Sequence, residues 1–513
     1  MENIHKIAED IVGKFADTCR ISKPKYAIID KGGEDYLSIY VGKINEIYAN
    51  VIAKTKAQLD ESNLFKNNMF LKEQTPKSWL QSSEISLLQS LLAESLTIGR
   101  SSLESDFYKN FTPFLDGQEN LIISKTNNVI YGRRGAGKSS LILYSCNQAK
   151  KDKIPFVWIA MQQYHQRDDF QVIPQFLYEL TEQCVEHQGM EFDRAERLKK
   201  IIYKLEDKGE SLTIKELKIT LPLFAREFLP FVKEKGYFLL FIDDLHLLQP
   251  EFQSVFLSAI YSFARGNNIF LKITAIENLT QLYNENKNKG LQSPGDVQIV
   301  RLDYNLVNPQ ATYDHVINIL NSYIKYVGIP SIISLCSKEA TYRLVWVSAG
   351  VPRDALYVFN NSISKALSLK RKNVAVTDIN MSSADSMIEK ERYLSDDVKD
   401  ETDLLKKVIA DIKNFCIKDI NSNAFLVHIE NSDIIYQTIK KLIDLRFIHM
   451  LHPGITPERA GEKYEVMMLD YAFYTGFRKT SSISEFKPVP SLPAVKELRK
   501  LKRYNFRKRI VLT

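Results

Sequence analysis

Short, continuously apolar runs alternate with longer stretches of helical periodicity between residues 106 and 307. An apolar run of this length is typical of a strand buried on both faces, and the intervening stretches are long enough for crossover helices. The pattern therefore predicts an α/β domain with a parallel sheet. The expected strands lie within 127–132, 154–161, 237–244, 269–276 and 297–304.

The rest of the chain has a different pattern. Residues 308–395 carry apolar positions at helical spacing, and the charged stretch 390–402 indicates a linker. Residues 403–475 suggest helix, helix, helix, strand, turn and strand. Residues 1–105 mix helical segments with a candidate hairpin around Lys31 and carry no pattern that indicates chemistry. We expect five segments: 1–105 (role unknown), 106–307, 308–395, 396–480 and a tail, 481–513.

Composition narrows the class of protein. Of the 513 residues, 44% are apolar and 26% charged, which is close to the globular average and argues against a disordered chain. No run approaches the roughly 18 apolar residues of a membrane helix, and the N-terminus has no apolar core of a secretory signal. The five cysteines are too dispersed for a zinc or disulfide framework. We expect a cytoplasmic protein that does not enter a membrane.

The net charge of +7 is concentrated at the C-terminus. Residues 496–513 contain eight basic residues and one acid, Glu497, a balance of 8 − 1 = +7, so the remainder is neutral. Cations interleaved with Tyr504 and Phe506 favour contact with phosphates and stacking on bases. A solvated tail, or one that docks on an acidic partner, fits the same pattern. The cations are Lys496, Arg499, Lys500, Lys502, Arg503, Arg507, Lys508 and Arg509.

Residues 132–139 satisfy the pattern G-x-x-x-x-G-K-[ST] between a predicted strand and a predicted helix. Glycines let successive backbone N–H groups turn toward phosphates, and the helix N-terminus adds its positive end. Lys138 is expected to reach the β- and γ-phosphates, and the Ser139 hydroxyl to ligate Mg²⁺. The predicted nucleotide-binding residues are Gly132, Arg133, Arg134, Gly135, Ala136, Gly137, Lys138, Ser139 and Ser140.

Two further strands end in polar residues. The run 238–242 leads into Asp243 and Asp244, and ligands of α/β sheets bind at the carboxyl ends of strands. We expect Asp243 to hold Mg²⁺ opposite Ser139, and Asp244 to orient the attacking water. Thr274 ends the following strand, where it is either a residue between the acids and the γ-phosphate or an ordinary β-branched strand residue.

Together these elements resemble the AAA+ ATPases, in the branch of origin-recognition and replication-initiator proteins of prokaryotic type, over about residues 111–477. The resemblance implies a P-loop core, a helical lid at 308–395 and a winged-helix domain at 396–480. It also implies that Phe114 to Glu119 covers the adenine and that Thr274 is the sensor 1 residue. Gly350 to Leu356 looks like the sensor 2 motif, whose Arg353 would touch the γ-phosphate from the lid.

Two departures from the family pattern bear on hydrolysis. The family usually ends its second acidic strand with Asp-Glu, whereas this chain has Asp243 and Asp244, a pair also common in the signalling NTPases of the STAND type. The stretch 284–296, where the family carries its arginine finger, contains no arginine; Arg265 follows an earlier helix and Arg301 falls within the next strand. We therefore expect catalysis by Asp244, Lys138, Thr274 and Arg353 that is slow or triggered by a partner.

The predicted winged helix offers a second nucleic-acid surface. A helix at 433–445, capped by Ser432, would present Gln437, Lys440, Lys441 and Asp444 away from its apolar face. Such a helix can lie in a major groove, although Asp444 would repel phosphate, and a winged helix used for protein contact is nearly as compatible with the pattern. The wing, 456–463, would add Arg459 and Lys463.

Two functions follow. The first is an ATP-binding, Mg²⁺-dependent and ATP-hydrolysing AAA+ protein that couples nucleotide state to DNA binding or to assembly with other ATPase subunits. The second is a STAND-like regulatory NTPase that recruits a protein effector, as in a prokaryotic transposition or antiviral defence system. A simple small-molecule enzyme is the weakest interpretation, because no independent catalytic cluster is present.

Overall fold

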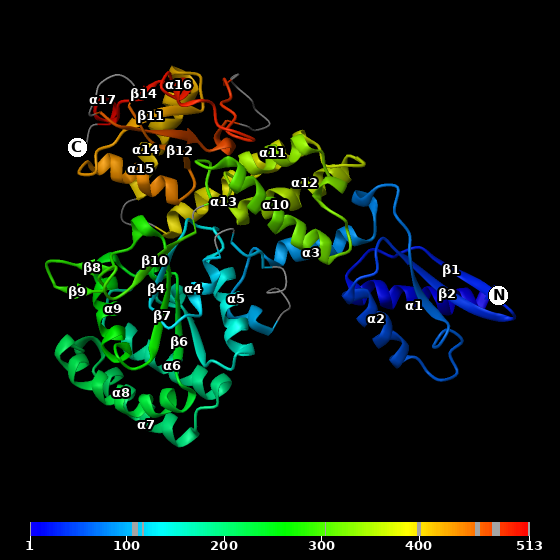
Figure 1. Ribbon diagram of the computed structural model, residues 1–513, viewed down its shortest axis with the longest axis horizontal. Helices are drawn as coiled ribbons and strands as arrows, with labels where there is room; N and C mark the ends of the chain where they lie inside the picture. The colour runs from blue at the N-terminus through cyan, green and yellow to red at the C-terminus, as the bar shows by residue number, and fades with distance from the viewer. Residues whose placement is uncertain are drawn as a thin grey trace.

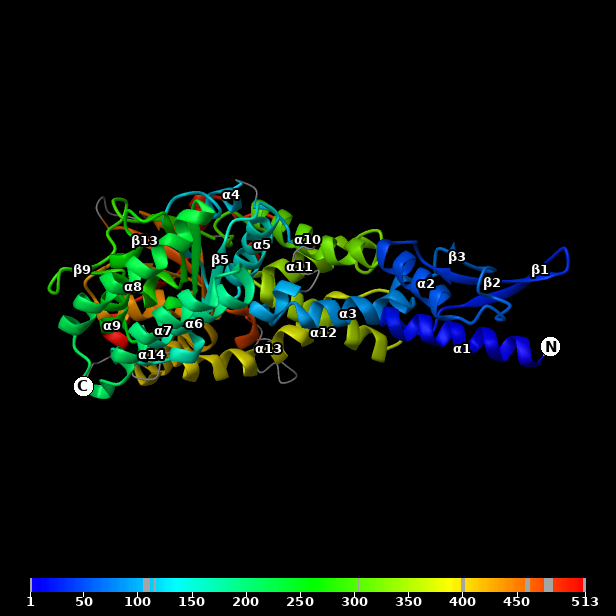
Figure 2. The same cartoon turned by 90° about the horizontal axis from the view of Figure 1, so that it is seen from below.

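The computed structural model describes residues 2–104, 111–114, 117–302, 304–397, 402–456, 462–474 and 483–510. Figures 1 and 2 show an elongated molecule. An N-terminal module (residues 2–94) lies at one end. A sheet domain (111–302) and a C-terminal domain (402–510) lie at the other, and a helical domain (304–397) lies between. Among the described residues, no helix is long and apolar enough to span a bilayer.

The sheet domain confirms the predicted α/β fold. Its five parallel strands run in the order β10-β4-β7-β6-β5, with helices on both sides. Every residue of β4 and β6 is buried, as continuous apolar runs require. The strands are β4 (Asn128–Tyr131), β5 (Phe156–Ala160), β6 (Phe238–Asp243), β7 (Ile269–Ala275) and β10 (Gln298–Arg301).

The helices of this domain close its two faces. A small antiparallel pair, β8 (Tyr283–Asn284) and β9 (Lys289–Gly290), occupies the stretch that lacks an arginine finger. The helices are α4 (Glu119–Ile122), α5 (Lys138–Lys151), α6 (Val172–Gln188), α7 (Phe192–Glu206), α8 (Ile214–Lys235) and α9 (Pro250–Ala264), with 3₁₀ turns η6 (Leu245–Leu247) and η7 (Glu277–Leu279).

The helical domain follows the prediction, except at its end. Its last helix continues to Asp397, so the predicted linker at 390–402 is wrong over most of its length. A run of charged residues satisfies an exposed helix as well as a loop. The elements are α10 (Pro309–Tyr326), η8 (Ile332–Ser334), α11 (Lys338–Val347), α12 (Pro352–Ser368) and α13 (Val376–Asp397).

The N-terminal module contains the predicted hairpin, β1–β2, and a third strand that pairs with β2 in parallel. Its last helix, α3, leaves the module and runs along the helical domain (Figure 2). The elements are α1 (Glu2–Cys19), β1 (Tyr26–Lys31), β2 (Glu34–Val41), α2 (Glu46–Gln58), β3 (Met69–Glu73), η1 (Trp79–Gln81), α3 (Glu84–Glu94) and η2 (Arg100–Glu104).

The C-terminal domain differs from prediction in its middle. A strand, β11, replaces the second of the three predicted helices and pairs with the hairpin β12–β13. Asp433, rather than Ser432, caps α15 by accepting from the N–H groups of Ile435 and Tyr436. Strands β12 and β13 correspond to the two predicted strands, whereas residues 457–461 of the predicted wing lie outside the described residues. The elements are α14 (Thr402–Asn414), β11 (Ala424–His428), α15 (Ile434–Asp444), β12 (Ile448–Ile455) and β13 (Tyr464–Leu469).

The basic tail forms secondary structure and is part of the C-terminal domain, so the alternative of a merely solvated tail is wrong for its described residues. Strand β14 extends the sheet by pairing with β11 in parallel, and Tyr504 and Phe506 are buried. Buried rings cannot stack on bases, so that part of the expectation is wrong. The tail elements are α16 (Val495–Leu498), β14 (Arg503–Tyr504) and α17 (Phe506–Arg509).

Candidate nucleotide site

The loop between β4 and α5 has the backbone conformation that a phosphate cradle needs. Gly135 and Gly137 have φ of 80° and 97°, in the left-handed region that side chains disfavour. A Cβ at Gly135 would also come within 2.8 Å of the Arg353 Cβ. Glycine at this position therefore permits both the turn and the close approach of the helical domain.

Lys138 begins α5 and is buried. Its Nζ donates to the Gly132 carbonyl oxygen at 2.9 Å. Burial lowers the pKa of Lys138, and the carboxylates of Asp244 and Asp243 oppose that shift. The predicted proximity of Lys138 to both acids is therefore present in the folded chain.

The surroundings of Asp243 and Asp244 shift the pKa values of these two carboxyl groups in opposite directions. Burial and the neighbouring Asp244 raise the pKa of Asp243. Burial also disfavours ionised Asp244, but His246, Lys138 and other cations outweigh it and lower the pKa of Asp244. His246 Nδ1 lies 3.9 Å from Asp244 Oδ1. Asp244 adopts a left-handed φ of 58°, which redirects the chain directly after the strand.

Thr274 lies between the two acids. Its hydroxyl donates to Asp243 Oδ1 and accepts from the Asp244 N–H at 2.9 Å. The side chain is fully buried at the carboxyl end of β7. Thr274 therefore contacts both acids, whereas its contact with a γ-phosphate stays a prediction.

Arg353 reaches the site from the first turn of α12. Its backbone N–H donates to the Gly135 carbonyl at 3.2 Å, which ties the helical domain to the loop. Burial, with Arg446 and Arg134 nearby, lowers the pKa of Arg353. The next residue, Asp354, forms a buried ion pair with Arg446 of the C-terminal domain.

A cavity of about 210 Å³ brings these groups together. Arg134, Lys138, Asp244 and Arg353 line it, so cations from two domains face one acid across it. This is chemistry suited to a polyphosphate. The remaining lining residues are Ser95, Ile98, Gly135, Gly137, Ser139, Ser140, Gln162, His246, Leu247, Ile276, Pro352 and Leu356.

An adjoining apolar cavity, of about 70 Å³, suits a flat base. Phe111 and Phe114 line it, and Phe114 stacks near His315, with ring centroids 5.7 Å apart. Phe114 opens the segment predicted to cover adenine; residues 115 and 116 of that segment lie outside the described residues. Ala136 lines this second cavity rather than the first.

The arrangement fits a magnesium–triphosphate ligand. Ser139 lines the cavity, and its hydroxyl opposes the rise in the pKa of Asp243, so a hydroxyl and a carboxylate, both able to ligate through oxygen, lie close together beside the cavity. Mg²⁺ in such sites takes only one or two protein ligands and completes its shell with water and phosphate. Among the described residues, no cluster of three or more His, Cys, Asp or Glu could hold a metal ion by itself.

Two predicted nucleotide-binding residues, Gly132 and Arg133, do not line the phosphate cavity. The Arg133 guanidinium donates to the carbonyls of Tyr304 and Ala349 at 2.8 and 3.3 Å, so it anchors the helical domain. Gly132 and Arg133 line a separate cavity of about 340 Å³ against α15. Sequence reasoning also missed His246, which follows Asp244 closely, and Ser95 and Ile98, for which no local signal exists.

Some of the candidate nucleic-acid residues contact other parts of the protein, whereas others are exposed. Asp444 accepts from the side chain of Asn278 at 2.8 Å, and Lys440 pairs with Glu465, so part of the predicted outer face of α15 is turned to protein. In the tail, Arg507 pairs with Glu430, and Arg509 pairs with Asp411 and Asp419. Arg459 lies outside the described residues. All the predicted cations of the tail are exposed, the ion-paired Arg507 and Arg509 included; the others are Lys496, Arg499, Lys500, Lys502, Arg503 and Lys508.

The family comparison matches residues 190–424 to the ORC-CDC6-like family. A search of curated proteins finds no match. Solved structures with similarity include the ORC1 protein of Aeropyrum pernix in complex with DNA, at 14% identity and TM-score 0.38, covering 72% of this chain and 93% of that one. The Walker-type ATPase paby2304 of Pyrococcus abyssi has 13% identity and TM-score 0.42, covering 71% and 98%.

The family match covers somewhat less than half of the chain. The match includes β6, β7 and α12, which carry the acids, Thr274 and Arg353. The P-loop precedes the matched region and is joined to it in one parallel sheet. The chain is therefore similar to the ORC-CDC6-like family over residues 190–424, and the parallel sheet within that similarity also carries the phosphate loop.

Proposed function

We propose that this protein binds ATP with Mg²⁺ and uses the bound state to control association with DNA. The observation that carries the proposal is the shared cavity, in which the P-loop, Asp244 of the sheet domain and Arg353 of the helical domain face one another. A triphosphate in that cavity would contact both domains at once. Its γ-phosphate would therefore set the angle between them.

The residues divide the chemistry in the following way. Lys138 and Arg353 would balance charge on the phosphates, and Ser139 with Asp243 would hold Mg²⁺, which supplies further charge neutralisation when bound. Asp244, with its lowered pKa, is ionised at neutral pH and able to orient a water. Thr274 would keep the two carboxylates in register. ATP hydrolysis is the expected reaction, slow or stimulated by a partner.

DNA association is supported by the exposed lysines of the tail together with the similarity of residues 190–424 to the ORC-CDC6-like family. Structures of proteins with similarity include one described as in complex with DNA. Because the tail forms part of the C-terminal sheet, deleting it would disturb the domain as well as remove charge. Neutralising the exposed lysines in place is the better test, and the salt dependence of binding reports how many phosphates they contact.

A second function, a nucleotide-controlled switch that recruits a protein effector, is favoured by one specific observation. Part of the predicted DNA-reading face of α15 lies against Asn278 of the sheet domain, where it cannot enter a groove. The Asp243–Asp244 pair, shorter than Asp-Glu, also suits a switch that retains its nucleotide.

The deciding experiment measures affinity for duplex DNA with and without Mg²⁺-ATP, in the parent and in Asp244→Asn. Nucleotide-dependent affinity supports the first function, and absence of DNA binding at moderate salt supports the second. Lys138→Ala should abolish ATP binding. If it binds ATP as tightly as the parent, the site assignment is wrong.

A further inference from the structure

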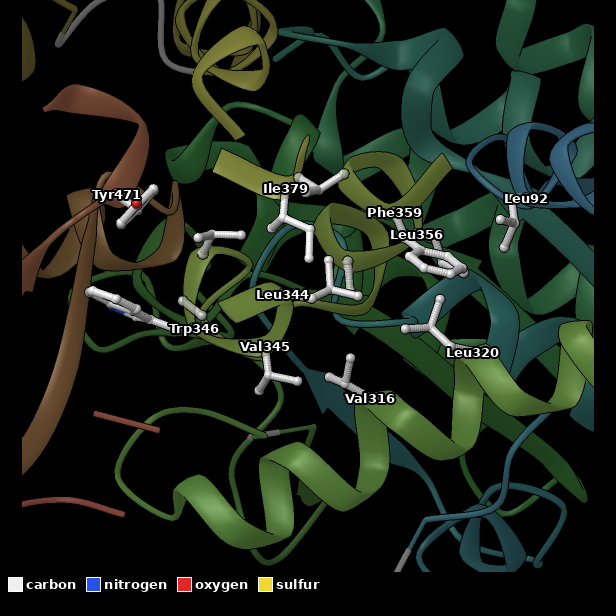
Figure 3. Packing of buried hydrophobic residues seen from close by; sticks show 14 of the residues in the cluster. Leu92, Val316, Leu320, Leu344, Val345, Trp346, Leu356, Phe359, Ile379 and Tyr471 are labelled. Atoms are coloured by element: carbon white, nitrogen blue, oxygen red, sulfur yellow. The ribbon is translucent and has the colours of Figure 1, made fainter. Parts of the chain in front are cut away.

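The last helix of the N-terminal module is packed on the helical domain. Leu92 of α3 lies beside Leu356 and Phe359 of α12 and Leu320 of α10 in one apolar cluster (Figure 3). Gln89 donates to the Ser364 hydroxyl at 2.8 Å. Buried apolar contact between two helices is the main source of rigid attachment in water.

Further contacts attach the body of the module to the same domain. The Ser78 hydroxyl donates to the Lys372 carbonyl at 2.7 Å, and the Tyr48 hydroxyl donates to the Val327 carbonyl at 3.3 Å. A Cβ at Gly328, whose φ is 90°, would lie 2.9 Å from the Lys43 carbonyl oxygen, so the two backbones are closely apposed. The body of the module is thus fixed to the helical domain at several separate points.

The apolar clusters divide the molecule in the same way. One cluster contains residues of the N-terminal module, the helical domain and the C-terminal domain. The sheet domain has its own two clusters. Leu96 packs on the first, whereas Ile98 and Leu103 pack on a cluster of the sheet domain. The chain therefore crosses from one body to the other within residues 96–98.

This crossing occurs at the nucleotide site. Ser95 and Ile98 line both the phosphate cavity and the base cavity. On one side, Ser95 lines the base cavity together with Tyr323 of α10, and its hydroxyl donates to the Leu92 carbonyl at 2.7 Å. On the other, Arg100 pairs with Glu186 and lies 3.6 Å from Glu179 of α6. Residues 95–104, which we name the joint segment, thus form a wall of the site between two bodies.

We infer that Ser95 and Ile98 are nucleotide-contact residues, and that the N-terminal module is an arm carried by the helical domain, whose position relative to the sheet domain depends on the bound nucleotide. The inference rests on the proposed function, since it needs ATP in the cavity. Nucleotide contacts made with both bodies favour one angle between them. The arm moves with the helical domain because its apolar contacts are with that body.

The first test measures distances between spin labels in the full chain, with and without Mg²⁺-ATP. All five native cysteines are buried, so introduced surface cysteines react selectively. The pair Lys31→Cys and Lys200→Cys joins the arm to the sheet domain. The control pair, Lys31→Cys and Asn373→Cys, joins the arm to the helical domain. All three positions are exposed.

Nucleotide should shift the distance of the first pair and leave that of the control pair unchanged. Binding is measured separately, by anisotropy of a fluorescent ATP analogue. If the analogue binds while the first pair stays fixed, or if the control pair shifts as much, the arm inference is overturned and the proposed function stands. If the analogue does not bind, the proposed function falls, and this inference with it.

The second test concerns the proposed apolar contact between Ile98 and the nucleotide. Ile98→Ala removes three carbon atoms and should weaken binding of the analogue by at least about tenfold, because the loss of a single methylene from a binding pocket already costs about 10-fold or more. The matched control is Ile333→Ala, at an isoleucine that is 54% exposed on the helical domain, and its affinity should equal that of the parent. Equal affinity in parent and Ile98→Ala, with the analogue bound, would overturn the assignment of Ile98 to the nucleotide.

Discussion

The ion pair between Arg446 and Asp354 offers the sharpest test of how the C-terminal domain is held. Arg446 follows α15, and Asp354 is next to Arg353 in the first turn of α12. We propose to replace Arg446 with methionine, which keeps much of the apolar stem and removes the guanidinium. The change leaves the Asp354 carboxylate buried without this partner.

The expected cost follows from burial. The side chains of Arg446 and Asp354 are only 3% and 12% exposed, and removing one partner of a buried pair costs about 3–5 kcal/mol. Arg353 is a second cation near Asp354 and offsets part of the loss, so we expect a cost of about 3 kcal/mol, at the lower end of that range. That is a large fraction of the roughly 5–15 kcal/mol by which domains are stable.

Urea unfolding followed by circular dichroism measures this cost. The matched control is Arg301→Met, which removes the exposed pair with Glu277 and should cost less than about 1 kcal/mol. In the double variant with Asp354→Asn, the two losses should not add, because the single variants remove the same interaction. A cost for Arg446→Met no greater than that of the control would refute the reasoning.

Three further predictions follow from the site and the fold. Thr274→Val should lower ATP turnover by about 10–100-fold, with affinity for the ATP analogue little changed, because the hydroxyl orders the two acids; unchanged turnover would contradict this role. Replacing Lys496, Lys500, Lys502 and Lys508 with glutamine should reduce the slope of log affinity for DNA against log salt by about 3–4, whereas replacing the exposed Lys200, Lys204, Lys215 and Lys218 should not. Burial lowers the pKa of Lys272 to about 7, so the unfolded chain binds more protons between about pH 7 and 10 and the folded state gains stability as pH rises there, by at most about 1.4 kcal/mol per unit. Lys272→Met should lose that gain, and parallel pH profiles of stability in parent and variant would contradict it.

The local features of the nucleotide site could be predicted from sequence because each is encoded by a short segment. A glycine pattern between a strand and a helix specifies a phosphate loop. Acids at the end of an apolar run must lie at the carboxyl edge of a parallel sheet, where that loop also opens. Thr274 follows from the same rule, but its role remained open until the hydroxyl was seen between Asp243 and Asp244.

The C-terminal predictions failed where long-range pairing competes with local pattern. The alternation of cations and aromatics in 496–509 is equally that of a short strand with a buried face. Its pairing with β11 decides between the two, and Val427 of β11 pairs with Tyr504 from far along the chain. Lys440 and Asp444 lie on the polar side of α15 as predicted, yet that side is met by Glu465 and Asn278 from other elements.

The sequence by itself determined the parallel sheet, the phosphate loop, the acidic strand end and the arginine at the start of α12. These depend on periodicity and backbone geometry within short segments of the chain. Only the tertiary structure decided that Ser95 and Ile98 wall the site, that Arg446 holds Asp354, and that the basic tail is folded. Each of these contacts joins segments that are far apart in the chain. Such contacts form because the segments bury apolar surface together and because a buried charge without a partner costs free energy.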